Sequence, residues 1–301
     1  MNYDIITILG PTASGKTNLA TRLAYKIGGE IISADSRQVF KGMDIGTGKD
    51  IEEYEVKGKL IPYHLIDIVN PGEIYNVFRY AQDFGRVYEA IKQRNNIPIL
   101  CGGTGLYISA VTQGYDFYDG EPDEDLRKEL EKKDIGYLQQ KINKLGIKLN
   151  ESDFYNKRRL VRHIEAAISK NKRKHITLPA LNTLYIGVSI DKETRRKKIH
   201  KRLIERLQNG MIEEVDRLLK EVGKDVLISY GLEYRYVTLY LIGKMNYDDM
   251  IIELERAINR FAKRQMTWLR GMERKGIKIN WINIDMPTDE KIKIIKELAD
   301  F

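Results

Sequence analysis

Residues 10–17 read Gly10-Pro11-Thr12-Ala13-Ser14-Gly15-Lys16-Thr17. This stretch matches the pattern G-x-x-x-x-G-K-[ST] in full, and it lies between an apolar run and a helix-like pattern, as a phosphate-binding loop does. In such a loop the backbone N–H groups cradle a di- or triphosphate, Lys16 neutralises its outer oxygens and the hydroxyl of Thr17 ligates Mg²⁺. The motif therefore predicts binding of a phosphorylated substrate, and it leaves open which bond is broken.

The segments on either side of the loop predict an α/β fold, a P-loop NTPase-like parallel sheet flanked by helices. Short apolar runs that we expect to be strands lie at Ile5–Leu9, Glu30–Ser33, Pro98–Cys101, Leu184–Ile190 and Ile279–Ile284. Apolar residues at helical spacing occur at 18–27, 80–94, 106–113, 192–222, 233–243 and 246–272.

The character of the sequence changes after Gly114. Residues 122–174 are strongly charged, their apolar residues follow a helical period, and strand signals are almost absent from them. We therefore expect an all-helical insertion domain at 115–182, and a catalytic core formed by residues 1–114 and 183–301.

Charge is distributed unevenly along the 301 residues. The chain has 51 Lys and Arg against 43 Asp and Glu, for a net charge of +8, and 42% hydrophobic residues exclude global disorder. Residues 1–112 hold as many acidic as basic side chains, so the whole excess follows them. This asymmetry indicates a neutral catalytic part joined to a part that binds a polyanion. Charge alone gives equal support to solvated helix faces rich in lysine.

The single cysteine, Cys101, allows no intrachain disulfide, which fits a reducing cytoplasm. The first residues show no secretory leader pattern, and no apolar run approaches the length of a membrane span. The four histidines have no metal-ligand spacing with Cys101, so a zinc site is not favoured. We expect a monomeric cytoplasmic protein without a membrane partner.

A second loop, residues 33–49, follows the second expected strand and begins Ser33-Ala34-Asp35-Ser36-Arg37-Gln38. In a doubly wound sheet this places Asp35 near Lys16, where a carboxylate can serve as a metal ligand or general base. The alternative is an N-cap of a following helix. A convincing Walker-B strand is missing, because Ile97–Cys101 ends in Gly-Gly and Leu65-Ile66-Asp67 is short. The lack of a Walker-B strand disfavours motor and switch NTPases, and it favours small-molecule kinases or enzymes that use other diphosphates.

Five motifs occur in order along the chain, and together they resemble the tRNA dimethylallyltransferase family, also called tRNA isopentenyltransferases. They are Gly10–Thr17, Asp35–Gln38 with Gly42–Lys49, His64–Asp67, Gly102–Tyr107 and Ala262–Arg270. The resemblance implies transfer of a dimethylallyl group from dimethylallyl diphosphate to N6 of the adenosine 3′-adjacent to the anticodon. The phosphate loop then holds a diphosphate leaving group, with Mg²⁺ at Thr17.

The resemblance also implies roles for individual residues. Asp35 is the base that takes a proton from the adenine amine, and Thr104 lies near donor and acceptor. Either Arg202 or Arg206 reaches the diphosphate, and Arg202 is favoured. The tRNA contacts that it implies are Asp35, Ser36, Arg37, Gln38, Thr104, Arg127, Arg158, Arg159, Leu160, Val161 and Arg162.

The basic residues support an RNA partner, because stretches 157–174 and 195–206 are strongly positive, and residues 256–270 interleave arginines with Phe261 and Trp268. The sequence departs from the family pattern in three places. Arg158 stands where Gln is usual, His163 where Ala is usual, and Ser229–Arg235 replaces a more regular segment. These departures suggest a divergent branch of the family with its own tRNA contacts.

Three other functions compete with this interpretation. A small-molecule or nucleotide kinase would use the same loop for ATP, but it would not need the basic insertion. An isopentenyltransferase acting on free AMP-type nucleotides would not need it either. An RNA-binding module with a vestigial phosphate loop is disfavoured by the intact Lys16, Thr17 and Asp35.

Overall fold

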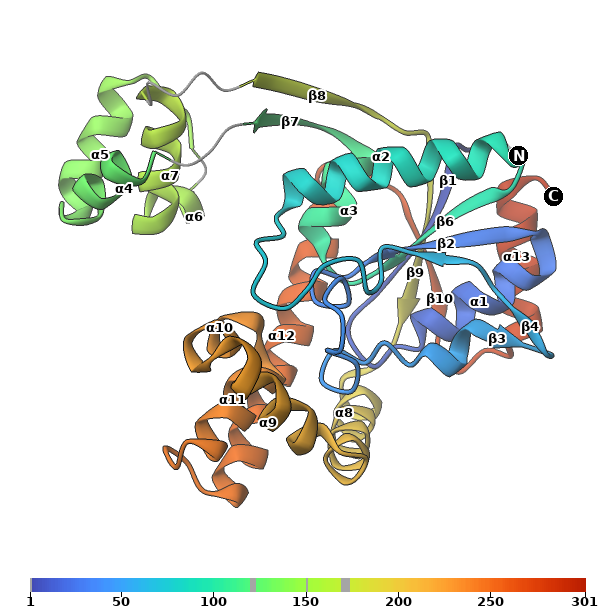
Figure 1. The fold of residues 1–301 in the computed structure, drawn as a ribbon. Helices are drawn as coiled ribbons and strands as arrows, with labels where there is room; N and C mark the ends of the chain where they lie inside the picture. Colours follow the sequence, from blue (N-terminus) through green and yellow to red (C-terminus); the bar gives the residue numbers. More distant parts are fainter. Residues whose placement is uncertain (1, 120–122, 150, 169–173) are drawn as a thin grey trace. The chain divides into compact units, whose positions relative to one another are not determined.

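The computed structural model describes residues 2–119, 123–149, 151–168 and 174–301 (Figure 1). It divides into a core unit, residues 1–114 with 179–301, and an insertion unit, residues 115–178. The sequence suggested boundaries after residues 114 and 182. Within the described ranges, no helix has both the length and the apolar character needed to cross a membrane.

A six-stranded parallel sheet forms the centre of the core unit, in the order β10-β9-β1-β6-β2-β5. The strands are β1 (Ile5–Leu9), β2 (Gly29–Ala34), β5 (Tyr63–His64), β6 (Ile97–Gly102), β9 (Thr183–Ser189) and β10 (Ile279–Asn283). The expected parallel sheet is confirmed, and each of its five expected strands is present. Strand β5 was not anticipated, because two residues are too few to show a period. The order puts the loops after β1, β2 and β6 side by side at one edge.

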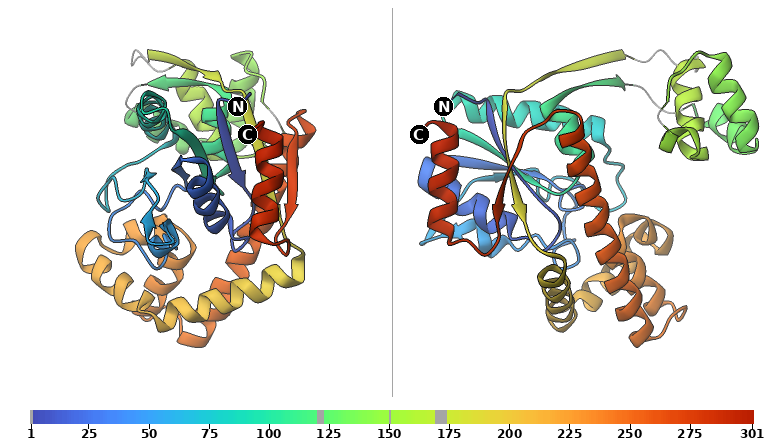
Figure 2. Two further views of the ribbon diagram at one scale, coloured as in Figure 1. Left: turned by 90° about the vertical axis from the view of Figure 1, so that its right-hand side faces the viewer. Right: turned by 180° about the vertical axis from the view of Figure 1, so that it is seen from behind.

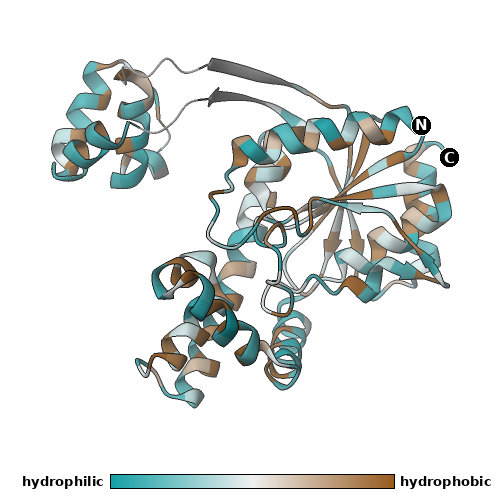
Figure 3. Cartoon of the chain, in the orientation of Figure 1, coloured by the Kyte–Doolittle hydropathy of each residue, from teal (hydrophilic) through white to brown (hydrophobic). Residues whose placement is uncertain are grey.

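Helices cover both faces of this sheet (Figure 2). Helices α1 (Lys16–Ile27) and α13 (Thr288–Ala299) lie on one face, and α2 (Val77–Gln93) and α3 (Gly105–Thr112) lie on the other. Alternate residues of β1 point to opposite faces, so that Ile6 and Ile8 pack with α1 and α13. Figure 3 shows the apolar strands at the centre of the core unit, with helices of mixed apolar and polar residues around them. A hairpin of β3 (Glu55–Val56) and β4 (Lys59–Leu60) adjoins η1 (Ile51–Tyr54).

A helix bundle with its own apolar core follows β9. It contains α8 (Lys192–Gln208), α9 (Met211–Val222), α10 (Lys224–Tyr230), α11 (Leu232–Leu241) and α12 (Tyr247–Arg274), the last of which reaches α3 (Figure 2). The expected helix 192–222 is two helices, because Gly210 adopts a φ of 97° and breaks it. Val39, Phe40 and Met43, from the loop after β2, are buried in this same core. The helix bundle therefore holds the loop that follows β2 in place.

The insertion unit is mainly helical. Its helices are α4 (Glu124–Glu131), α5 (Ile135–Lys144), α6 (Glu151–Phe154) and α7 (Lys157–Ile168), which enclose buried residues such as Leu138 and Ile164. The expectation of an all-helical insertion is wrong in one respect, since β7 (Gln113–Asp119) and β8 (Lys174–Ala180) pair as a two-stranded sheet. The aromatic run Tyr115-Asp-Phe-Tyr has strand propensity, but it is too short to stand out in a charged segment.

Candidate active site

A cavity of about 620 Å³ lies in the core unit, at the edge where the loops after β1, β2 and β6 meet the helix bundle. Its lining includes the phosphate loop, Asp35–Gln38, the Gly102–Thr104 turn, and side chains from α8, α11 and α12. The sheet order explains this convergence, because β2 and β6 are neighbours and β6 pairs with β1. The sequence-predicted phosphate loop, candidate base and Thr104 thus share one chamber.

The phosphate loop needs its glycines for space and for conformation. Gly15 adopts a φ of 72°, and a Cβ at Gly10 would lie 2.9 Å from the Ser14 hydroxyl and 3.0 Å from the Val188 carbonyl oxygen. Lys16 Nζ donates to the Pro11 carbonyl oxygen at 2.7 Å. Burial, with a smaller contribution from the charge of Arg202, lowers the pKa of Lys16 to about 8. A bound anion would offset this effect of burial, because an opposite charge nearby stabilises the protonated ammonium.

Asp35 and Thr104 lie together at the ends of β2 and β6. Asp35 Oδ1 accepts from the N–H groups of Arg37 at 2.8 Å and Gln38 at 3.4 Å, which forms a turn. Asp35 is followed by a turn, and no helix begins within the described residues 36–50, so the alternative interpretation as a helix N-cap is wrong. Thr104 Oγ1 accepts from the Ser36 N–H at 3.2 Å, and Thr104 N donates to the Ala34 carbonyl oxygen at 3.1 Å.

The two residues after Ser36 make internal contacts. The Arg37 guanidinium carbon lies 5.9 Å from the centre of the Tyr230 ring, and burial lowers the pKa of Arg37. The Gln38 amide accepts from the Ser33 hydroxyl at 3.0 Å and donates to the Gly48 carbonyl oxygen at 2.9 Å. Both side chains still line the cavity.

Two arginines of α8 face the loops across the cavity. Arg202 donates a hydrogen bond to the Thr12 hydroxyl. Arg206 lies 3.7 Å from the Asp50 carboxylate, and a Cβ at Gly48 would be only 1.6 Å from Arg206 Nη2. Burial, together with the positive charge of Arg206, lowers the pKa of Arg202 to about 10. Arg202 is therefore joined to the phosphate loop, whereas Arg206 is held against the loop after β2.

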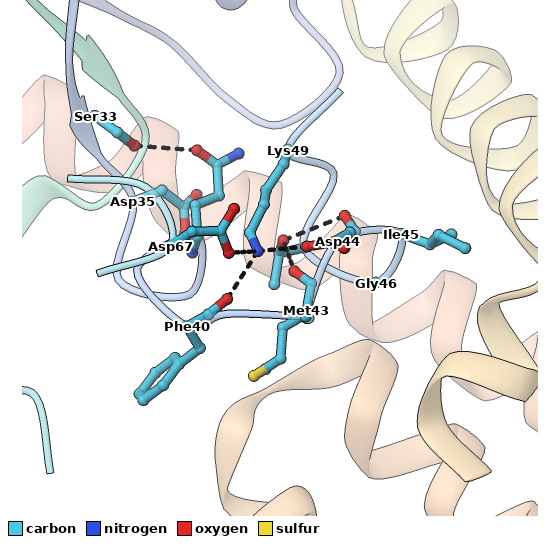
Figure 4. Close-up of polar contacts among 12 residues, drawn as sticks. Ser33, Asp35, Phe40, Met43, Asp44, Ile45, Gly46, Lys49 and Asp67 are labelled. Atoms are coloured by element: carbon cyan, nitrogen blue, oxygen red, sulfur yellow. Dashed lines mark hydrogen bonds and ion pairs between the residues drawn. The ribbon is translucent and has the colours of Figure 1, made fainter. Parts of the chain in front are cut away.

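Asp67, the one weak candidate for a Walker-B carboxylate, serves a different purpose. The buried ammonium of Lys49 contacts Asp67, Asp44 Oδ1 at 2.5 Å and the Phe40 carbonyl oxygen at 2.8 Å (Figure 4). These contacts tie the two ends of the 40–49 loop to the segment after β5. Asp67 thus stabilises a loop, and it is paired with Lys49.

Sequence reasoning missed two residues that shape the site. Glu214 of α9 accepts from the N–H groups of residues 44, 45 and 46 at 2.8, 2.8 and 3.0 Å, and from the Tyr234 hydroxyl at 2.7 Å. Gln265 of α12 contacts both Thr12 and Gly103. Nothing in the sequence distinguishes Glu214 from the exposed acids of its helix. Gln265 stands inside the motif Ala262–Arg270, which could have directed attention to it.

The predicted RNA-binding residues of the insertion unit differ in exposure. Arg158, Arg159 and Arg162 are exposed on α7, whereas the side chains of Leu160 and Val161 are buried in its apolar core. Arg127 Nε donates to the buried carboxylate of Glu165 at 2.9 Å. Part of the basic stretch 157–174, residues 169–173, lies outside the described residues.

The donor set at the cavity suits a weakly liganded hard cation. Among the described residues, no group of three or more His, Cys, Asp or Glu side chains could hold a metal by itself. Thr17 and Asp35 both line the cavity, and Mg²⁺ commonly takes one or two protein oxygens, with phosphate oxygens and water completing its shell. The residues present therefore fit Mg²⁺ bound jointly with a diphosphate.

A complete phosphate loop at the edge of a parallel sheet, with a carboxylate and two arginines of helix α8 lining the same cavity, defines a P-loop-like protein. The chain belongs to the IPP transferase family, whose model matches residues 38–272.

Relatives match over nearly the whole chain. A tRNA dimethylallyltransferase 2 of Bacteroides fragilis is 51% identical over 98% of both chains, and a tRNA dimethylallyltransferase 1 of Parabacteroides distasonis is 50% identical over 97% of this chain and 96% of its own. The crystal structure of a tRNA isopentenylpyrophosphate transferase from Bacillus halodurans superposes with a TM-score of 0.72 at 31% identity, covering 98% of this chain and 95% of that one. A eukaryotic dimethylallyltransferase acting on tRNA shares the fold, with a TM-score of 0.77 at 22% identity, covering 98% and 79% respectively.

Proposed function

We propose that the chain transfers a dimethylallyl group from dimethylallyl diphosphate to N6 of the adenosine 3′-adjacent to the anticodon in tRNA, releasing diphosphate. One observation carries the proposal: the phosphate loop, Asp35 and Thr104 line a single cavity, and Thr104 bonds the amide next to Asp35. Membership in the IPP transferase family and relatives named for this activity support it.

Negative charge builds on the diphosphate as the allylic C–O bond breaks. In the proposed mechanism the loop amides, the ammonium of Lys16 and the guanidinium of Arg202 stabilise this charge. Preorganised donors of this kind usually make the largest single contribution to lowering a barrier. Thr17 would hold Mg²⁺ together with the diphosphate oxygens, and the ion would supply further charge neutralisation when bound. The leaving group departs as diphosphate.

The acceptor is a weak nucleophile, because the lone pair of an exocyclic adenine amine is delocalised into the ring. In the proposed mechanism Asp35 accepts a proton from N6 as the C–N bond forms, so that the product amine is neutral. The Thr104 hydroxyl and the Asp35 turn act on the same side of the cavity, since the Ser36 N–H links them. Donor and acceptor would then meet in one chamber.

The partner RNA would bind through contacts between its phosphate backbone and the protein, in addition to the adenosine that enters the cavity. Splaying an adenosine out of the anticodon loop costs a few kcal/mol. Arg158, Arg159 and Arg162 supply exposed positive charge that can offset this cost through phosphate contacts. We further propose that Arg127, held by Glu165, contacts the same RNA, and that the enzyme works as a cytoplasmic monomer.

The test is a comparison of three acceptor reactions with the purified chain and Mg²⁺. Labelled dimethylallyl diphosphate is offered with unmodified tRNA or with AMP, and γ-labelled ATP is offered in a parallel reaction with nucleotide acceptors. Label in tRNA alone is expected. Label in AMP alone would favour the free-nucleotide enzyme, and phosphate transfer without prenyl transfer would favour a kinase.

A further inference from the structure

The side-chain amide of Gln265 joins the phosphate loop to the turn that carries Thr104. Its Oε1 accepts from the Thr12 N–H at 2.8 Å, and its Nε2 donates to the Gly103 carbonyl oxygen at 3.0 Å. The two loops are far apart in the sequence, and Gln265 comes from a third element, the long helix α12. One amide thus connects the predicted donor-binding loop with the predicted acceptor side.

The surrounding backbone is shaped around this amide. A Cβ at Gly103 would lie 2.3 Å from Gln265 Nε2 and 3.6 Å from the Gly10 carbonyl oxygen, so the close approach requires glycine at position 103. Thr12 makes two hydrogen bonds to the helix bundle, because Gln265 accepts from its N–H and Arg202 donates to its hydroxyl. These two bonds fix the position of Thr12 within the phosphate loop.

The contacts continue from Gly103 to the candidate base. Thr104 is the next residue, and its hydroxyl accepts from the Ser36 N–H, one residue after Asp35. A displacement of the Gly103 carbonyl would therefore move Thr104 and, through it, the turn of Asp35. A glutamine amide carries both the acceptor that the Thr12 N–H needs and the donor that the Gly103 carbonyl needs, whereas an ionised carboxylate only accepts.

From these contacts we propose that Gln265 is a positioning residue, which sets the distance between the diphosphate-holding loop and the Thr104–Asp35 side of the cavity. The inference rests on the proposed prenyl transfer for its kinetic consequence. Gln265 acts through its hydrogen bonds to Thr12 and Gly103, and replacing it should lower the rate of the transfer step itself. Misplacing reacting groups by about 1 Å can lower a rate by about a hundredfold.

Two variants separate the donor and acceptor functions of the amide. Gln265→Glu keeps the acceptor for Thr12 but turns a carboxylate oxygen towards the Gly103 carbonyl, whereas Gln265→Leu loses both bonds. Asn259→Asp is the matched control, because Asn259 lies on the same helix but outside the cavity lining. Among the described residues, its amide N–H donates to the Glu255 carbonyl oxygen at 3.0 Å and its Oδ1 has no hydrogen-bond partner.

The first measurement is the single-turnover rate with saturating tRNA and donor. We expect both Gln265 variants to be about tenfold to a hundredfold slower, with KM for tRNA changed less than about twofold and Asn259→Asp near wild type. Because a protonated carboxyl regains a donor, the ratio of the Gln265→Glu rate to the wild-type rate should rise as pH falls from about 8 to about 6. The corresponding ratio for Gln265→Leu should stay constant.

A second measurement does not depend on the reaction. Amide hydrogen exchange of the Thr12 N–H should accelerate in Gln265→Leu and remain slow in Asn259→Asp. Normal transfer rates in both Gln265 variants, or a loss shared equally by Asn259→Asp, would overturn the inference. Unchanged exchange at Thr12 would overturn it as well. Failure of the wild type to label tRNA would instead count against the proposed function.

Discussion

The guanidinium of Arg202 donates a hydrogen bond to the hydroxyl of Thr12, and so joins helix α8 to the phosphate loop. Arg206, one turn further along α8, is held instead by Asp50 and the backbone at Gly48. From this difference in partners we predict that Arg202, and not Arg206, contacts the donor diphosphate. The positive charge of Arg202 is therefore brought to the phosphate loop by a helix of the bundle that follows β9.

Replacing Arg202 by glutamine should weaken donor binding. Hydrogen bonds to charged groups are worth about 1.5–3 kcal/mol, so KM for dimethylallyl diphosphate should rise about tenfold to a hundredfold. Steady-state kinetics with tRNA held saturating gives the value. Lys197→Gln is the control, since Lys197 lies on the same helix, is 76% exposed and is absent from the cavity lining. An equal effect of both variants would contradict the assignment.

Donor affinity should depend on pH through Lys16. Its pKa in the free protein is lowered to about 8, and the diphosphate binds the protonated ammonium. The dissociation constant of dimethylallyl diphosphate should therefore be constant below about pH 8 and increase above it. Calorimetric titrations between about pH 7 and pH 9 measure this. Lys16→Arg should remove the inflection, because a guanidinium stays charged throughout this range; an inflection that survives in that variant would assign it to another group.

Glu214 should stabilise the loop at residues 44–46. Glu214→Gln replaces a carboxylate that accepts from three backbone N–H groups by an amide that turns N–H against one of them. We expect a loss of about 2–3 kcal/mol in the free energy of unfolding, measured by urea denaturation. Glu213→Gln changes an exposed neighbour on the same helix and should have little effect. Equal stability of the two variants would show that the carboxylate is not needed.

Asp67 should be dispensable for metal activation. Because it pairs with Lys49, Asp67→Asn should lower the melting temperature while leaving the Mg²⁺ concentration for half-maximal activity unchanged. Magnesium titrations of the transfer rate decide this point. A several-fold increase in the Mg²⁺ requirement would restore Asp67 as a Walker-B carboxylate.

The exposed arginines of α7 should account for part of the salt dependence of tRNA binding. In Arg158→Ala/Arg162→Ala, the slope of log affinity against log salt concentration should decrease by about 1 for each arginine that contacts a phosphate. Filter binding over a range of salt concentrations gives the slope. Lys197→Ala/Lys293→Ala removes the same charge from two exposed sites of the core unit. A slope changed equally by both pairs would attribute the effect to net charge alone.

The sequence predicted the fold and the main groups of the site because these have local signals. Strong apolar runs mark the strands, and Gly10–Thr17 is a continuous motif whose geometry follows from its own glycines. The contacts that fix the site join residues distant in the sequence, such as Glu214 with Ile45, and they leave no local pattern. Gln265 lies within the motif Ala262–Arg270, but that motif does not reveal its partners Thr12 and Gly103. Strand β7 was missed for a different reason, since a few aromatic residues among charges do not establish a period. The expected substrates, dimethylallyl diphosphate and tRNA, came from the resemblance to the tRNA dimethylallyltransferase family. The phosphate loop by itself predicts only a phosphorylated ligand.

The proposed transfer is tested most directly by nucleoside analysis of unmodified tRNA that has been incubated with dimethylallyl diphosphate, Mg²⁺ and the chain. A parallel incubation contains the Asp35→Asn variant instead. We expect N6-dimethylallyladenosine at the position 3′-adjacent to the anticodon with the wild type. We expect none with Asp35→Asn, although that variant should bind tRNA with nearly unchanged affinity. Full modification by Asp35→Asn, or a modified base elsewhere in the tRNA, would contradict the proposed mechanism.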